Sequence, residues 1–140
     1  MRKGLKALAV AALAIGTLAL TAESASADSY SQYQGGVRSV SYGRCTALMD
    51  GAYDDTLGYW VARGAFSMTG GDGDGQCFGA LYRKKDGSST WTQVSYDIAA
   101  SAYPNWNRTA YHWDGPGAES KVCITWGIGR IDEGLCSDPW

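Results

Sequence analysis

The chain has 140 residues, of which 45% are hydrophobic and 19% are charged, as in an ordinary globular protein with one domain. Its formal net charge of -2 argues against a nucleic-acid-binding protein, because that function requires an extended basic surface. The one basic cluster, Arg83–Lys85, flanks an Asp-Gly turn, and this arrangement is typical of a solvated hairpin end.

Residues 1–27 have the features of a secretory signal peptide. Basic residues near the start precede an apolar run, Ala7–Leu20, and Ala25-Ser26-Ala27 places small residues around a cleavage site. The run is shorter than the roughly 20 apolar residues that span a bilayer. We therefore expect cleavage after Ala27 and a secreted, extracellular protein that has no membrane anchor.

The next segment, Asp28–Gly36, contains no aliphatic residue and ends in two glycines. It cannot bury an apolar face of its own, so we expect a mobile arm in the free protein. A polar arm with tyrosines can add to another protein's sheet or lie in its cleft, whereas a plain spacer would bind nothing. The candidate partner-binding residues are Ser29, Tyr30, Gln32, Tyr33 and Gln34.

Residues 37–140 show the period-2 alternation of strands rather than the 3.6-residue period of helices. The alternation is found in Ser39–Tyr42, Tyr59–Met68, Cys77–Tyr82, Thr92–Ile98, Thr109–Trp113 and Val122–Ile128. Leu48–Leu57 and Ala99–Tyr103 are compatible with a short helical turn. Six or seven short strands with Gly- and Asp-rich connections predict an all-β fold, a small antiparallel β-sandwich or barrel.

All four cysteines follow the predicted leader, and an even number of cysteines in an exported chain indicates two disulfides. A zinc site would need close pairs, but the nearest two cysteines are 13 residues apart. Three pairings are possible. We favour Cys45 with Cys77 and Cys123 with Cys136, because neighbours in the sequence are the commoner partners.

Catalytic and metal-binding motifs are weak in this sequence. Gly70–Gly75 carries spaced aspartates but fails the EF-hand pattern, since Arg83 stands where the last ligand, a glutamate, belongs. His112 is the single histidine, and no nucleophile motif accompanies it. The acid pairs Asp54-Asp55 and Asp132-Glu133 are adjacent, so their side chains diverge on a strand. We expect a protein without enzyme activity, cofactor or metal.

Aromatic residues and amides are concentrated in Tyr103–Arg108. Such rings stack on sugars or anchor protein interfaces, and Tyr103 and Trp106 are the candidate ligand-binding residues. Trp106 stands in a polar loop and is expected to be exposed, whereas Trp113 is expected in the core. Two alternatives to a protein-binding role remain open. One is a secreted protease inhibitor that uses an exposed loop, and the other is a carbohydrate-binding module.

The leader, the four cysteines and the Gly- and Trp-rich β pattern look like those of small secreted actinobacterial proteins. Within this group, the layout and the stretch Trp113–Gly117 before Val122-Cys123 resemble the adaptor subunit of the umbrella toxin particles of Streptomyces. The resemblance implies a non-enzymatic adaptor that links a lectin-bearing subunit to the toxin polypeptide in antagonism between bacteria. The segment Asp28–Gly36 would then be inserted into a partner's cleft.

Overall fold

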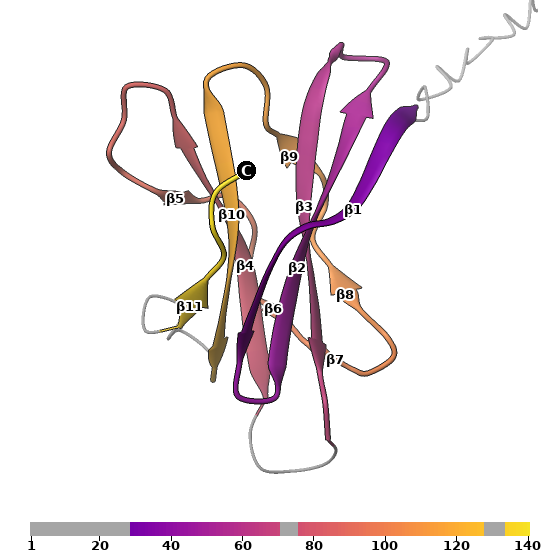
Figure 1. The fold of residues 1–140 in the computed structure, drawn as a ribbon, viewed down its shortest axis with the longest axis vertical. Coiled ribbons are helices and arrows are strands. Elements are labelled where there is room, and N and C mark those ends of the chain that lie inside the picture. The colour runs from indigo at the N-terminus through magenta and orange to yellow at the C-terminus, as the bar shows by residue number, and fades with distance from the viewer. Residues whose placement is uncertain (1–28, 71–75, 128–133) are drawn as a thin grey trace, which may run out of the picture.

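The computed structural model describes residues 29–70, 76–127 and 134–140 as two β-sheets packed face to face, with no helix in these ranges (Figure 1). The all-β prediction is thus confirmed. Sheet A has the strand order β1-β2-β3-β7, with β8 and β9 also paired to β3. Sheet B has the order β11-β10-β4-β5, with β6 also paired to β4. All pairings are antiparallel except the short one between β3 and β7.

Five long strands carry the two sheets. They are β1 (Tyr30–Tyr42), β2 (Cys45–Asp54), β3 (Tyr59–Met68), β4 (Cys77–Lys85) and β10 (Ala118–Trp126). The short strands are β5 (Thr92–Gln93), β6 (Ile98–Ala99), β7 (Ser101–Ala102), β8 (Asn107–Arg108), β9 (His112–Trp113) and β11 (Leu135–Cys136).

The core lies between the inner faces of the sheets and is built from alternate residues of the long strands. Phe66 on β3 is its largest fully buried side chain. A Cβ atom at Gly79 on β4 would lie 2.1 Å from the Phe66 ring, so that this site in the opposite sheet requires glycine. The other buried members are Cys45, Ala47, Met49, Ala62, Cys77, Leu81, Ala100, Val122 and Ile124.

Both predicted disulfides are present in the favoured pairing. Cys45–Cys77 joins the start of β2 to the start of β4 and so connects sheet A to sheet B. Cys123–Cys136 joins β10 to β11, where the two cysteines are register partners. Two intramolecular disulfides are compatible with an extracellular or otherwise oxidising environment.

The helical turn predicted for Leu48–Leu57 is wrong, because β2 continues to Asp54. Tertiary packing decides this segment, since Ala47 and Met49 are buried between the sheets on alternate positions. Ala99–Tyr103 is also not helical, and it contributes to the short strands β6 and β7 instead.

The segment expected to be a mobile arm differs most from the sequence prediction. Residues from Tyr30 onward belong to β1, which runs antiparallel to β2 through the boundary predicted at Gly36. Two irregularities, between Ser31 and Gln34 and between Gln34 and Arg38, interrupt the register. Gln32 has φ of 48° and Gly36 has φ of 62°. The strand is therefore held by backbone pairing and by contacts of its tyrosines, although it has no aliphatic residue before Val37.

Candidate functional site

The candidate site lies on the outer face of sheet A and is centred on Asp50. This residue is 4% exposed, although it faces away from the core. β2 and β3 pair without a register shift, so Asp50 lies directly opposite Arg63. The turn that sets this register is capped by Asp54, whose Oδ1 accepts hydrogen bonds from the backbone N–H groups of Thr56 and Leu57.

Asp50 accepts hydrogen bonds from β1 and β3 at both carboxylate oxygens. Tyr33 Oη donates to Oδ2 at 2.9 Å, and the Gly36 N–H donates to Oδ1 at 3.0 Å. Arg63 Nε donates to Oδ2 at 3.2 Å, and Arg108 Nε lies 3.8 Å from the same oxygen. The irregularities in β1 place Tyr33 and Gly36 over the sheet, where they cover the carboxylate.

Aromatic rings complete this site, which we call the Asp50 cluster: Tyr30, Tyr33, Asp50, Arg63, Arg108 and Tyr111. The Arg63 guanidinium lies 4.6 Å from the Tyr111 ring centroid and 5.6 Å from that of Tyr33. The Tyr30 and Tyr111 rings are 4.5 Å apart.

Two titratable groups of the Asp50 cluster have shifted pKa values. Burial lowers the pKa of Arg63, but the hydrogen bond with Tyr33 and the neighbouring Tyr111 and Asp50 raise it overall. Burial raises the pKa of Tyr111, and the positive charge of Arg63 opposes this effect only in part. Both groups therefore keep their protons at neutral pH, with Arg63 charged and Tyr111 neutral.

The second predicted site, Tyr103 and Trp106, belongs to the same face. Together with Thr46, Ser67 and Thr69 these residues line a hollow of about 150 Å³. Thr46 pairs with Ser67, Leu48 with Ala65, and Asp50 with Arg63. These pairs stand at alternate positions along β2 and β3. Residues at this spacing share one face of a sheet, so the hollow and the Asp50 cluster lie roughly 13 Å apart on one surface.

The structure also corrects the expected exposure of two tryptophans. Trp106 is half-buried, and its neighbour Tyr103, at 65%, is the more exposed ring. Trp113 is half-buried at the end of the sandwich rather than in the core, with Arg83 5.3 Å from its ring centroid.

The remaining partner-binding candidates line the start of β1. The Ser29 carbonyl accepts a hydrogen bond from the Asp55 N–H, Gln32 occupies the first irregularity, and Gln34 pairs with Gly51. They extend the surface of the Asp50 cluster along the edge of sheet A.

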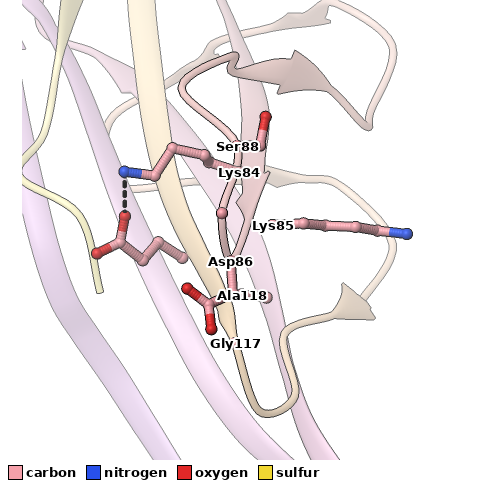
Figure 2. A pocket seen from close by; sticks show the side chains of 8 residues that line it. Lys84, Lys85, Asp86, Ser88, Gly117 and Ala118 are labelled. Carbon is pink, nitrogen blue, oxygen red and sulfur yellow. Dashed lines mark ion pairs between the residues drawn. The ribbon is translucent and has the colours of Figure 1, made fainter.

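The basic cluster beside the Asp-Gly turn lies on sheet B, apart from this face. Lys84 and Lys85 extend in opposite directions, and Lys84 Nζ forms an ion pair of 2.6 Å with Glu119 Oε2 (Figure 2). These residues help to line a hollow of about 310 Å³, in which Asp86 and Glu119 offset the two lysines. The balance of charge agrees with a solvated hairpin end.

Neither of the weak catalytic candidates gathers a reactive set around it. His112 lies in β9 and pairs with Ala62 of β3. Burial and the charge of Arg83 lower the pKa of His112. Asp54 is buried at the turn between β2 and β3, whereas Asp55 is exposed and accepts a hydrogen bond from the Ser31 hydroxyl. Residues 71–75 of the Gly70–Gly75 loop and the pair Asp132-Glu133 lie outside the described residues. Within the described ranges, no three His, Cys, Asp or Glu side chains are grouped to hold a metal ion.

The sequence did not single out Asp50, Arg63, Arg108 or Tyr111. A signal for the first two exists in the hairpin turn between β2 and β3. If Asp54 pairs with Tyr59 across this turn, counting four residues away from the turn along each strand places Asp50 opposite Arg63. For Arg108 and Tyr111 no comparable signal exists, because β8 is only two residues long and is distant in the sequence.

Fold and site together define a small disulfide-linked β-sandwich domain with an ordered arginine–tyrosine surface. Comparisons with protein-family models, with curated proteins and with solved structures found no match to this chain. No helix in the described part of the chain is long and apolar enough to cross a membrane.

Proposed function

We propose that this chain is an exported, non-enzymatic adaptor that binds a protein partner through the outer face of sheet A. The observation that carries the proposal is the Asp50 cluster, in which one buried carboxylate holds Tyr33, Arg63 and Arg108. Side chains that are already ordered lose little conformational entropy when a partner binds.

The composition of this face supports a protein partner. Tyrosine, tryptophan and arginine are the residue types that contribute most to protein interfaces. Tyr33 is 55% exposed and Tyr103 is 65% exposed, so both rings retain area that a partner can bury. The hollow beside Tyr103 and Trp106, of about 150 Å³, has room for one side chain rather than for a drug-sized ligand of roughly 300–1,000 Å³.

Charge indicates the chemistry of the partner. Two arginines, Arg63 and Arg108, share the single carboxylate of Asp50, which leaves this patch with one excess positive charge. The chain as a whole is negative. A partner surface with Asp or Glu side chains would therefore complement the Asp50 cluster in particular.

The expected secretion and the resemblance to umbrella toxin adaptors are consistent with this role. The two disulfides suit export through the predicted leader, residues 1–27. In a toxin particle the partner would be another secreted subunit. Since Tyr30 and Tyr33 belong to β1, we propose that the partner docks on them in place, without extraction of the segment into a cleft.

Site-specific photocrosslinking in the native secreted fraction tests the proposal. A photoreactive phenylalanine at Tyr33 or Tyr103 should form a covalent adduct with one defined protein. The matched control is Tyr96, a 90% exposed tyrosine in the connection between β5 and β6 of sheet B, which should give no such adduct. An Arg108→Ala change should weaken the adduct at Tyr33.

Two results would contradict the proposal. One is an equal adduct yield from Tyr33, Tyr103 and Tyr96, which would indicate unspecific collision. The other is the absence of a protein adduct at both positions of sheet A in a fraction that contains all secreted proteins of the source cell.

A further inference from the structure

A third hollow, separate from the Asp50 cluster, opens at one end of the sandwich. It has a volume of about 180 Å³ and is lined by Trp60, Asp114, Ala118 and Trp140. We call it the tryptophan hollow. Trp60 comes from β3 of sheet A and Ala118 from β10 of sheet B, so the site spans both sheets. The proposed protein-binding role uses none of these residues.

The two tryptophans form rigid, perpendicular walls. Their ring centroids are 5.7 Å apart at an interplanar angle of 88°, and the Tyr53 ring meets Trp60 edge-on. Trp140 is held against β10 by two backbone hydrogen bonds with Ser120. Its six-membered ring covers Gly51, where a Cβ atom would lie 2.3 Å from the ring.

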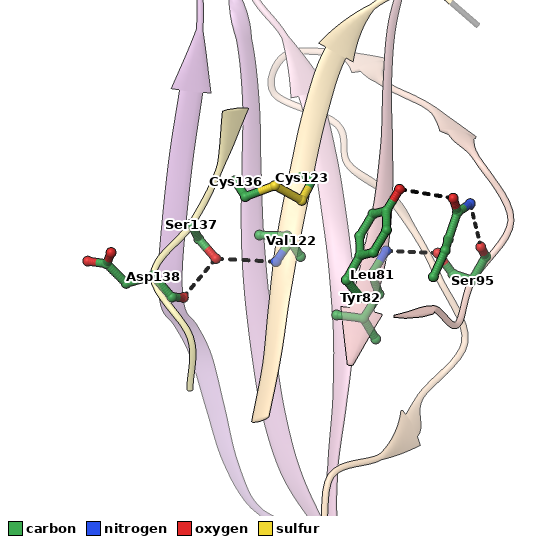
Figure 3. Close-up of a disulfide and its surroundings, with 9 residues drawn as sticks. Leu81, Tyr82, Ser95, Val122, Cys123, Cys136, Ser137 and Asp138 are labelled. Carbon is green, nitrogen blue, oxygen red and sulfur yellow. Dashed lines mark hydrogen bonds between the residues drawn. A yellow bond between two sulfur atoms is a disulfide. The ribbon is translucent and has the colours of Figure 1, made fainter. Parts of the chain in front are cut away.

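The segment that carries Trp140 is itself anchored. The Cys123–Cys136 disulfide fixes its start, and the Ser137 hydroxyl accepts a hydrogen bond from the Val122 N–H and donates one to the Asp138 carbonyl (Figure 3). The Trp140 wall is therefore in place before any ligand arrives.

A carboxylate supplies the polar group of the hollow. Asp114 is 8% exposed, and its Oδ1 accepts a hydrogen bond of 2.8 Å from the Ser120 hydroxyl. Every fully buried side-chain oxygen in the described residues has a hydrogen-bond partner. Within the described residues Oδ2 of Asp114 accepts no hydrogen bond, so this oxygen is not fully buried, and Asp114 is one of the residues that line the hollow.

The charge balance around Asp114 decides the kind of ligand. Arg83 Nη1 donates a hydrogen bond to the Trp113 carbonyl. Burial raises the pKa of Asp114, and the hydrogen bond from Ser120 and the charge of Arg83 oppose this rise only in part. Glu119 acts in the opposite sense but is itself paired with Lys84. Asp114 therefore supplies the hollow with a hydrogen-bond acceptor whose negative charge Arg83 offsets in part.

Flat aromatic faces beside an acceptor for hydroxyl groups suit a sugar ring, whose C–H face is apolar and whose edge is polar. The volume is below the roughly 300–1,000 Å³ of sites for drug-sized ligands, so a single ring fits. We propose that the tryptophan hollow binds one pyranose ring, with the ring against a tryptophan face and a hydroxyl group donating to Asp114 Oδ2.

The test is an NMR titration of the folded, oxidised protein with methyl glycosides of glucose, galactose, mannose and N-acetylglucosamine, together with a glycan array. The indole N–H signals of Trp60 and Trp140 should shift, while those of Trp91 and Trp106 stay in place. Asp114→Asn should weaken binding by about tenfold, as expected for loss of a hydrogen bond to a charged group. Trp91→Phe is the matched control, because Trp91 belongs to neither the Asp50 cluster nor the tryptophan hollow, and it should bind as the unchanged protein does.

The titration spectra of each variant also report whether it is folded, so loss of binding is separable from loss of structure. The experiment distinguishes a site for free sugars from a site for the ends of glycans. A site for glycan ends gives a signal on the array, whereas a site for free sugars responds only in the titration. The proposal fails if no glycoside or glycan binds, or if Trp106 rather than Trp60 and Trp140 responds. It also fails if tetramethylammonium, tested in parallel, binds the hollow more tightly than every glycoside.

Discussion

Asp50 is the residue that orders the outer face of sheet A. Its replacement by alanine leaves Arg63 without its anion and Tyr33 and Gly36 without their acceptor. We expect Asp50→Ala to lower the free energy of unfolding by about 3 kcal/mol, since one partner of a buried charge pair is removed. Urea denaturation measures this value. Asp55→Ala is the control, because Asp55 is exposed, and should cost below about 1 kcal/mol.

Asp114 makes the stability depend on pH in acid solution. Burial raises the pKa of its carboxyl above the ordinary value of 3.8, so the folded chain keeps this proton after the unfolded chain has lost it. The tighter binding of this proton in the folded chain therefore stabilises the fold fully below pH 3.8. This stabilisation is lost as the pH rises through the pKa of Asp114 in the folded chain. Asp114→Asn should remove this loss, so that the variant gains stability relative to the unchanged protein as the pH increases.

Denaturation at a series of pH values measures the difference between the two proteins. His112 acts in the opposite direction, because its pKa is lowered from 6.5, but it is present in both proteins and cancels in the difference. A difference that does not change with pH would show that the carboxyl of Asp114 is not shifted upward.

At the scale of elements, the sequence predicted strands well where large apolar residues alternate. β3 begins and ends where the alternation of Tyr59–Met68 predicted. β4 begins at Cys77 as predicted but continues to Lys85, and β10 begins at Ala118, four residues before the predicted Val122. β2 was missed because its inward positions hold small residues, such as Ala47 and Gly51. Their burial depends on Phe66 and Trp140, which approach from elsewhere in the fold.

The first part of β1, before Val37, was missed for another reason. Its first residues bury little apolar area, and what orders them is pairing with β2 together with the contacts of Tyr30 and Tyr33. These contacts require Asp50 and Tyr111, so they exist only after the rest of the sheet has formed. Composition alone therefore predicts disorder where tertiary contacts impose a strand.

The irregularities of β1 give a matched pair of substitutions. Gln32 has a left-handed backbone, with φ of 48°, so Gln32→Gly should relieve strain and stabilise the fold by about 0.5 kcal/mol. Gly36 has φ of 62° with open space around its Cα, so Gly36→Ala should cost about 1 kcal/mol through the backbone alone. Thermal or chemical denaturation of both variants tests this, and equal effects in one direction would contradict it.

At the scale of the whole molecule, each disulfide constrains a different part of the sandwich. Removal of Cys45–Cys77, which closes a loop of 32 residues, should cost about 4 kcal/mol in the chain-entropy model. Removal of Cys123–Cys136, with a loop of 13 residues, should cost about 3 kcal/mol. Paired Cys→Ala variants, compared by denaturation, give the two values. A larger cost for Cys123–Cys136 would contradict the expected order.

The candidate site could be predicted only in part from the sequence. Tyr30, Tyr33, Tyr103 and Trp106 stood out as aromatic residues in polar surroundings, yet nothing in their spacing placed them on one face. That placement follows from the register of β2 and β3, which sets Thr46, Ser67, Asp50 and Arg63 on the same side. The tryptophan hollow could not be predicted from the sequence, because Trp60, Asp114 and Trp140 come from three distant segments.

The disulfides also determine how the protein behaves when it is pulled from its ends. Under tension, the residues inside each covalent loop are shielded from the load. Each extended residue spans about 3.3–3.6 Å. The loops of 32 and 13 residues therefore keep roughly 150 Å of chain from extending while the disulfides are intact. β1 and the strands between Cys77 and Cys123 lie outside both loops, so stretching would act on the pairing of β1 with β2 and on these strands. The oxidised domain would thus act as a short tether with a limited reach, and reduction would lengthen it.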